Sequence, residues 1–234
     1  MKRRPTYCII VAAGTGSRFG GNLPKQFCRL GGRPALMTTI ERLRGCLQPE
    51  DHIAVVLSQD FTGLWEELCR LHGFRSPKVV TGGATRWQSV KNALKVMPFD
   101  AHYVMVHDGA RPLVQTRVVD DLYRRLEKEG AEGVIPATKM TDSLRRLLPE
   151  GKSEAVNRSD YRGVQTPQLF HAGTLCLAYD QPYSEAFTDD ASVVEAFTGE
   201  PVSLVEGAVE TLKITHPADL VLVDFYLRKE NEAS

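Results

Sequence analysis

Two basic residues follow a glycine-rich loop near the start of the chain. Gly14 and Gly16 come directly after an apolar run, and Arg18 and Lys25 follow them. Glycines let backbone N–H groups approach an anion closely, and two positive charges beside them suit a triphosphate. Such charges would also stabilise negative charge that develops at phosphorus and on a pyrophosphate leaving group. Taken alone, the loop is explained equally well as a glycine turn with two solvated cations.

The spacing within this loop excludes two common nucleotide-binding motifs. Phe19 stands where the dinucleotide fingerprint G-x-G-x-x-G needs its third glycine. No Gly-Lys-Ser/Thr follows the loop, so a P-loop is absent as well. An NAD-linked dehydrogenase is therefore a remote alternative.

A second candidate group surrounds the sequence His107-Asp108-Gly109-Ala110-Arg111. Asp108 is expected at the carboxyl end of a central strand, where a carboxylate could hold Mg²⁺ or its water shell. Arg111 could bind a substrate phosphate through two parallel hydrogen bonds. The alternative is an Asp–Arg ion pair that closes a loop. His107 is expected to orient this loop rather than to act as a general base.

Three further segments could complete a site. Gly82 follows a predicted strand and Ser89 lies on the helix after it, so both could contact a base, although a plain strand–turn–helix junction explains them too. Thr188 or Asp189 is typical of a helix N-cap. Lys213 lies within a predicted apolar strand. Because a buried lysine without a partner is costly, an anionic ligand is expected near it.

The composition limits the classes to which this chain can belong. It has 234 residues, 42% of them hydrophobic, with 29 basic and 29 acidic side chains. One large α/β domain spanning residues 1–234 is expected, and the zero net charge argues against nucleic-acid or membrane partners. No segment approaches the roughly 20 apolar residues of a membrane helix. The five cysteines form no C-x-x-C pair, which favours reduced thiols and a cytoplasmic location.

The elements that would position these residues alternate along the chain. Short apolar runs predict strands at 7–13, 53–57, 79–81, 103–107, 133–136, 202–205 and 212–215. Apolar residues at spacings of three and four predict helices at 35–47, 61–72, 85–97, 117–129, 172–179, 190–197 and 218–229. Their order favours an open, mostly parallel, Rossmann-like sheet with helices on both faces.

Residues 138–160 interrupt this alternation. They contain two polar, strand-like segments, 138–146 and 154–158, separated by the turn signal Pro149-Glu150-Gly151. We expect a β-hairpin arm that stands off the sheet. Because an isolated two-stranded hairpin is marginally stable in water, the arm should pack against something, and a second subunit is the obvious candidate.

In this order, the segments resemble the methylerythritol-phosphate cytidylyltransferases. The resemblance runs from Ala12 to about Tyr226. Its strongest parts are Ala12-Ala13-Gly14-x-Gly16-x-Arg18 with Pro24-Lys25-Gln26, and His107-Asp108-x-Ala110-Arg111-Pro112. Support comes from Arg158, Gln165-Thr166-Pro167-Gln168, Thr188-Asp189-Asp190-Ala191-Ser192 and Lys213-Ile214-Thr215. Each segment alone is weak, whereas their joint occurrence in order is specific.

The resemblance implies a fold of the nucleotide-diphospho-sugar transferase type and a reaction. The 4-phosphate of 2-C-methyl-D-erythritol would attack the α-phosphorus of CTP in line, giving 4-diphosphocytidyl-2-C-methyl-D-erythritol and pyrophosphate for isoprenoid precursor synthesis. Mg²⁺ or another divalent cation would bridge the triphosphate oxygens. The resemblance further implies a homodimer whose arms cross, so that Ser143 and Arg158 serve the partner's site.

The resemblance also implies a role for each matching residue. The catalytic cations would be Arg18, Lys25 and Lys213. Contacts to CTP would come from Ala12, Ala13, Gly14, Gly16, Gly82 and Ser89. The sugar phosphate would be bound by Asp108, Gly109, Arg111, Ser143, Arg158, Thr166 and Thr188, with Asp108 also serving the metal.

Three departures and two alternatives remain at this point. Ala84 stands where some members have an acidic residue near the base, so base selectivity is less secure than the chemistry. Ser143 stands where a threonine is usual and Gly109 where an alanine is common, and none of the three removes a charge from the proposed centre. A ribitol 5-phosphate or related pentitol-phosphate cytidylyltransferase shares the loop and the His-Asp element. A non-catalytic nucleotide-binding module on the same fold is the other alternative.

Overall fold

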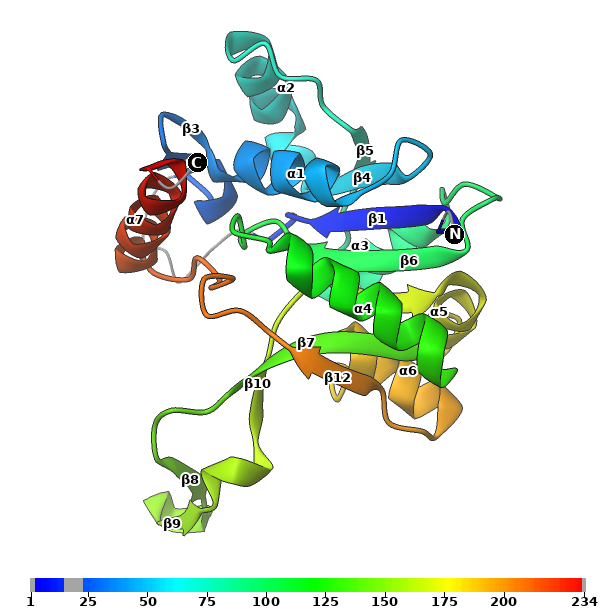
Figure 1. The fold of residues 1–234 in the computed structure, drawn as a ribbon, viewed down its shortest axis with the longest axis vertical. Coiled ribbons are helices and arrows are strands. Elements are labelled where there is room, and N and C mark those ends of the chain that lie inside the picture. The colour runs from blue at the N-terminus through cyan, green and yellow to red at the C-terminus, as the bar shows by residue number, and fades with distance from the viewer. Residues whose placement is uncertain (1–2, 15–22, 233–234) are drawn as a thin grey trace.

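An eight-stranded mixed sheet runs through the middle of the molecule (Figure 1). The computed structural model describes residues 3–14 and 23–232, so Gly16 and Arg18 lie outside the described residues. Four parallel strands form one half of the sheet, in the order β6–β1–β4–β5. They are β1 (Thr6–Val11), β4 (His52–Leu57), β5 (Lys78–Thr81) and β6 (Tyr103–Asp108).

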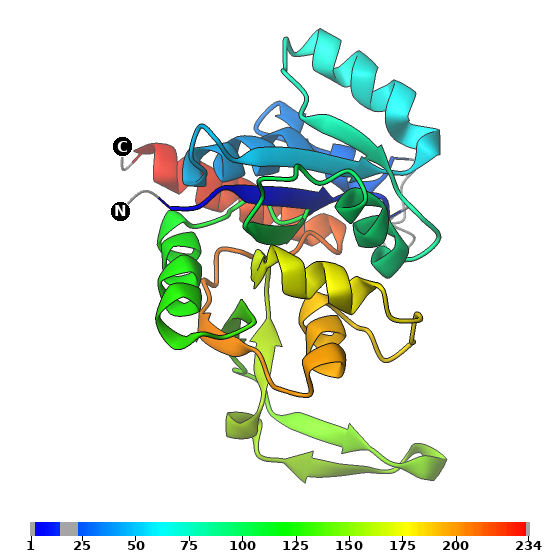
Figure 2. The same ribbon diagram turned by 90° about the vertical axis from the view of Figure 1, so that its right-hand side faces the viewer.

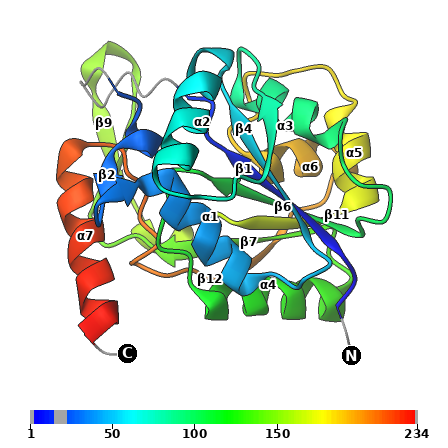
Figure 3. The same cartoon turned by 90° about the horizontal axis from the view of Figure 1, so that it is seen from above.

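These strands are apolar on consecutive positions because both faces of the sheet are covered. Cys8 and Ile10 of β1 point into one core, and Tyr7 and Ile9 point into the other. The first core lies under α1 (Ala35–Cys46), α2 (Thr62–Leu71) and α4 (Thr116–Glu129). The second lies under α3 (Arg86–Leu94), α5 (Ala172–Tyr179) and α6 (Asp190–Thr198). Figure 3 shows the sheet between these two layers. The expected α/β architecture is confirmed.

The other half of the sheet reverses direction. β11 (Gln168–His171) pairs antiparallel with both β6 and β7 (Gly133–Lys139). β10 (Arg162–Val164) continues along β7 antiparallel, and β12 (Ser203–Glu206) joins β7 in parallel. The carboxyl ends of β1, β4, β5 and β6 still meet at one edge, which is where ligands bind in such sheets.

Two small ribbons lie outside the main sheet. β2 (Arg29–Leu30) pairs with β3 (Arg33–Pro34) just before α1. β8 (Leu144–Leu147) pairs with β9 (Ser153–Val156) in a ribbon that projects well away from the body of the subunit (Figure 2). Leu147 on this ribbon is 83% exposed.

The predicted strand at 212–215 is wrong. This segment is irregular, and Ile214 N donates to Ala110 O at 2.8 Å. Its apolar residue, Ile214, packs with Leu113 and with Val223 of α7 (Pro217–Glu232) in a third, smaller core. The apolar pattern therefore reflects packing against a helix rather than a place in the sheet. Across residues 3–14 and 23–232, no helix is long and apolar enough to cross a membrane.

Candidate active site

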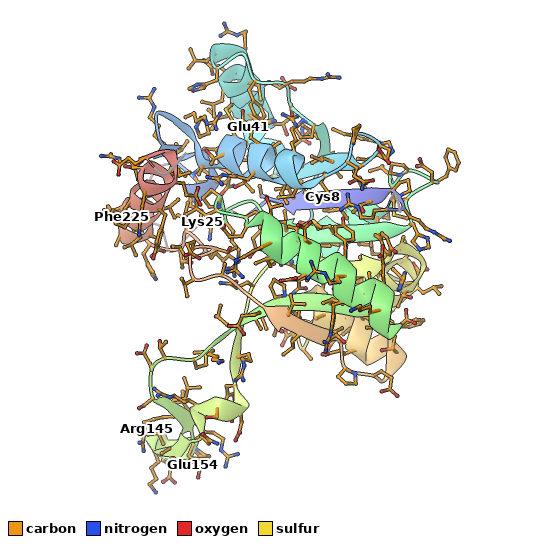
Figure 4. All side chains as sticks on the ribbon, in the orientation of Figure 1. Cys8, Lys25, Glu41, Arg145, Glu154 and Phe225 are labelled. Carbon is orange, nitrogen blue, oxygen red and sulfur yellow. The ribbon has the colours of Figure 1, made fainter. Side chains whose placement is uncertain are left out.

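A pocket of about 220 Å³ lies at the carboxyl ends of β1 and β6. Figure 4 shows Lys25 beyond the end of β1, on the side of the molecule where α7 lies. Among the described residues, five separate segments of the chain contribute to the pocket wall. Among the residues predicted from sequence, its lining contains Ala12, Ala13, Gly14, Lys25, Ser89, Asp108 and Lys213.

The glycine-rich loop starts from a fixed position. The side chain of Gln26, only 2% exposed, donates from Nε2 to the carbonyl of Ala12 at 2.7 Å and to that of Gly14 at 3.0 Å. Lys25 and Gln26 belong to one short 3₁₀ turn, Lys25–Phe27. The bonds of Gln26 therefore tie the segment that carries Lys25 to the end of β1.

The opposite wall of the pocket is the start of α3. Thr85 caps this helix by accepting from Gln88 N at 3.0 Å, as expected for a helix start there. Ser89 Oγ accepts from Gly83 N at 3.0 Å and donates to Thr85 O at 2.9 Å. A Cβ atom at Gly82 would lie 2.5 Å from Cβ of Ala13, so only glycine allows these two loops to approach. Gly82 thus shapes the pocket from behind its surface.

Asp108 ends β6 and faces three basic side chains. Its Oδ2 accepts from Lys213 Nζ at 2.9 Å and from Arg111 Nε at 3.2 Å. Its Oδ1 lies 3.8 Å from Nε of Arg86. Burial by itself would raise the pKa of Asp108, but the charges of Lys213, Arg86 and Arg111 hold it well below its usual range. Asp108 is therefore ionised at any working pH, and Oδ1 is the oxygen without a hydrogen bond from the described residues.

His107 is fully buried beside Asp108 and has both ring nitrogens engaged. Nε2 lies 3.0 Å from the carbonyl of Arg111, which can only accept, so Nε2 carries the proton. Nδ1 then accepts from the hydroxyl of Thr166 at 2.9 Å, and that hydroxyl oxygen accepts from Asp108 N at 3.0 Å. Burial lowers the pKa of His107 to about 4. A neutral His107 therefore holds the loop in place, in keeping with the orienting role predicted for it.

A second pocket of about 290 Å³ adjoins the first. Of the residues that the structure describes, three line both pockets: Arg86, Asp108 and Lys213. The second pocket adds Arg111 and Thr166 from the loops around β6 and β11, and Thr188 and Asp189 from the start of α6. Asp189, rather than Thr188, is the helix cap, and Ser192 completes a capping box with it.

Lys213 reaches this junction in a way that the sequence did not predict. It lies on the irregular segment before α7, and 39% of its side-chain surface is exposed. Its ammonium group pairs with Asp108 at 2.9 Å, so the premise of a buried, unpartnered lysine is wrong. The lysine nevertheless lines both pockets.

Three other predicted site residues line neither pocket of this subunit. Gly109 lies behind the wall, where a Cβ atom would come within 2.8 Å of Cβ of Ala12. Ser143 and Arg158 are exposed on the arm, where Arg158 donates to the carbonyl of Thr141. Gly16 and Arg18 lie outside the described residues.

The side chains that could act as metal ligands indicate how a cation would bind at this site. Within the described ranges, no group of three or more His, Cys, Asp or Glu side chains could hold a metal ion. Among the described residues that line both pockets, Asp108 is the one with a carboxylate, and its Oδ1 accepts no hydrogen bond from the described part of the chain. This donor set suits a Mg²⁺ ion that takes most of its ligands from substrate phosphates and water.

Sequence reasoning left Arg86 and Asp190 without a role. Arg86 donates to both oxygens of Asp190, from Nη1 at 2.9 Å and Nη2 at 2.6 Å. These residues are 104 positions apart, and no local pattern links them. One sequence signal could have identified Arg86. It is a basic residue shortly after Gly82-Gly83 at a helix start, which is a favourable place for an anion site.

Comparison with known proteins gives one consistent result. The family model described as "IspD: 2-C-methyl-D-erythritol 4-phosphate cytidylyltransferase" matches residues 6–229. The protein of that name from Porphyromonas gingivalis is 46% identical over 226 residues, covering 96% of this chain and 99% of that protein. Its namesake in Bacteroides fragilis is 45% identical over 213 residues, with 91% and 94% covered.

Solved structures agree with the sequence matches. The 4-diphosphocytidyl-2C-methyl-D-erythritol synthase of Anaerococcus prevotii superposes with a TM-score of 0.79 at 26% identity, covering 96% of this chain and 99% of that one. The 2-C-methyl-D-erythritol 4-phosphate cytidylyltransferase of Thermus thermophilus gives a TM-score of 0.71 at 30% identity, with 94% and 98% covered.

Proposed function

This chain belongs to the 2-C-methyl-D-erythritol 4-phosphate cytidylyltransferase family, and from that premise we propose how its residues carry out the transfer. The enzyme converts CTP and 2-C-methyl-D-erythritol 4-phosphate to 4-diphosphocytidyl-2-C-methyl-D-erythritol and pyrophosphate, a step of isoprenoid precursor synthesis. The family assignment favours methylerythritol phosphate over ribitol 5-phosphate and favours an enzyme over a binding module.

We propose that CTP occupies the pocket beside Lys25 and that the sugar phosphate occupies the pocket beside Arg111. The supporting observation is that Asp108 and Lys213 line both pockets, so the two phosphates would meet there. A phosphate oxygen of the sugar would form the new bond to the α-phosphorus as the bond to pyrophosphate breaks. Lys25, Lys213 and Arg18 would stabilise the charge on the crowded phosphates, and orientation would supply much of the rest.

We propose Mg²⁺, or another divalent cation, as the cofactor. The triphosphate would provide most of its ligands, and Asp108 Oδ1 would bind it directly or through water. When bound, the ion would neutralise charge on the phosphates and make pyrophosphate a better leaving group. Lys213 and Arg111 hold the other oxygen of the same carboxylate, which would keep Oδ1 oriented.

Lys25 provides the direct test of this assignment. The Lys25→Ala variant should lose about 10²-fold or more in turnover, the scale of removing one transition-state donor. Pyrophosphate release from CTP would be measured with methylerythritol 4-phosphate as acceptor. Arg29→Ala is the matched control, because Arg29 is an exposed cation four residues away that lines neither pocket. Undiminished turnover of the Lys25 variant would refute its role.

We also propose a homodimer formed through the arm at 138–160. The β8–β9 ribbon is a separate two-stranded sheet with an exposed leucine, and such a ribbon needs a partner surface for stability. Ser143 and Arg158 are exposed on this arm, which leaves them available to a second subunit.

We further propose small-molecule partners and a cytoplasmic location. The equal numbers of basic and acidic side chains suit small-molecule partners, and the five free thiols suit a reducing cytoplasm.

Mixing two inactive variants would test whether the arms cross. An Arg158→Ala chain and a Lys25→Ala chain would be unfolded and refolded together. If each arm serves the partner's pocket, a heterodimer has one intact site, and an equal mixture should recover about a quarter of wild-type activity. If each arm serves its own subunit, no site is intact and no activity should return, which would contradict the proposal.

A further inference from the structure

One ion pair links the walls of the two pockets. Arg86, at the start of α3, binds the carboxylate of Asp190 end-on through Nη1 and Nη2 at 2.9 and 2.6 Å. The Asp190 side chain is fully buried, whereas the Arg86 side chain keeps 30% of its surface accessible. Tyr179 donates a further hydrogen bond to Asp190 Oδ1 at 2.6 Å. The carboxylate is thus held by two side chains, and one of them, Arg86, lines both pockets.

The geometry of this pair controls how close Arg86 comes to Asp108. With both terminal nitrogens engaged by Asp190, only Nε of Arg86 faces Asp108, and it stays 3.8 Å from Oδ1. That distance is too long for a hydrogen bond. Asp190 therefore keeps the guanidinium of Arg86 out of hydrogen-bond range of Oδ1, while the positive charge of Arg86 stays near that oxygen.

The same pair also anchors the start of α6. Asp190 is the first residue of this helix and directly follows Thr188 and Asp189, which line the second pocket. Gln168 adds a second anchor, because its Nε2 donates to Asp189 Oδ2 at 2.8 Å. On the α3 side, Trp87 stacks on Tyr179 with ring centroids 5.7 Å apart and planes at 19°. Two successive residues of α3, Arg86 and Trp87, thus connect the first pocket to the second.

We propose that Arg86, held by Asp190, is a positioning residue that sets the sugar-phosphate pocket against Asp108. It fixes the start of α6 and keeps Asp108 Oδ1 free for the substrate or the metal shell. The loops that would hold the nucleotide have anchors of their own, because Gln26 binds the carbonyls of Ala12 and Gly14 and Ser89 binds Gly83 N. The inference rests on the proposed assignment of the two pockets.

Arg86→Lys tests this role while keeping the charge. Lysine cannot span both oxygens of Asp190 as the planar guanidinium does. We expect KM for methylerythritol 4-phosphate to rise roughly tenfold or more, as misplaced binding groups commonly cause, while the Kd of CTP changes less than about threefold. Asp190→Asn should change KM in the same direction, because the released guanidinium can then reach Asp108.

A double variant separates positioning from folding. Arg86→Gln with Asp190→Asn replaces the buried ion pair by two neutral amides, so no buried charge is left without its partner. Its melting temperature should lie close to that of the wild type, whereas its KM for the sugar phosphate should stay raised. Arg228→Gln is the matched control, since Arg228 pairs with Asp224 on the exposed side of α7 and should keep wild-type kinetics.

The outcomes are distinguishable. A wild-type KM for the sugar phosphate in the double variant, or in Arg86→Lys, would overturn the inference and make the pair purely structural. Equal weakening of CTP and sugar-phosphate binding would also overturn it. A wild-type enzyme that released no pyrophosphate from these substrates would instead refute the proposed function.

Discussion

The buried His107 should make this protein less stable in mild acid. The folded chain holds His107 neutral, with a pKa of about 4, because burial disfavours its charged form. In the unfolded chain the same side chain has a pKa of about 6.5. Between these two values the unfolded state binds a proton that the folded state does not bind, so acid favours unfolding. The stability that depends on a neutral His107 is fully present above pH 6.5 and is lost as the pH falls toward 4.

The two pKa values give the size of the effect. Because the unfolded chain takes up a proton on His107 that the folded chain does not, the free energy of unfolding of the wild type falls by about 2 kcal/mol between pH 7 and pH 5. For His107→Gln this titration is absent. Glutamine can still donate to the carbonyl of Arg111 but cannot also accept from Thr166, which costs roughly 1–3 kcal/mol at pH 7. The stability gap between the wild type and the variant should therefore narrow by about 2 kcal/mol at pH 5.

Urea unfolding at pH 7 and pH 5 measures this gap directly. Circular dichroism and tryptophan fluorescence should give coincident transitions, so that one free energy describes each protein. His216→Gln is the matched control, because His216 is an exposed histidine that lines neither pocket. A His107→Gln variant that loses as much stability as the wild type between the two pH values would refute the reasoning and place the titrating group elsewhere.

Three further predictions concern the pocket walls and the cofactor. Gly82→Ala places a Cβ atom 2.5 Å from that of Ala13, so the Kd of CTP, measured by calorimetry, should rise roughly tenfold. An unchanged Kd would mean that the loops of Gly82 and Ala13 can separate freely. Asp189→Ala removes the capping box of α6 and should lower the free energy of unfolding by about 1 kcal/mol in urea. An unchanged urea midpoint would show that the remaining bond from Ala191 N to Gln168 Oε1 is enough to hold the helix start. Chelation of divalent cations should stop pyrophosphate release, and added Mg²⁺ should restore it; full activity in excess chelator would exclude the proposed cofactor.

Much of the fold follows from local patterns. Consecutive apolar residues in β1, β4 and β6 predict strands covered on both faces, and the two cores confirm this. The order of strands and helices then predicts that Gly14, Asp108 and the residues after β5 meet at one edge of the sheet. The segment around Lys213 misled the same reasoning, because an apolar residue flanked by polar ones looks alike whether it packs in a sheet or under α7.

By itself, the sequence determined the family, the covered sheet and the basic and acidic residues that gather at its edge, because each depends on residue types at short spacing. Only the tertiary structure decided how those residues are held. The pair of Arg86 and Asp190 spans 104 positions, and the approach of Lys213 to Asp108 depends on how the chain crosses the sheet edge before α7. Such contacts arise where separate elements are packed together, and a side chain's partner at that range has no signature in the residues next to it.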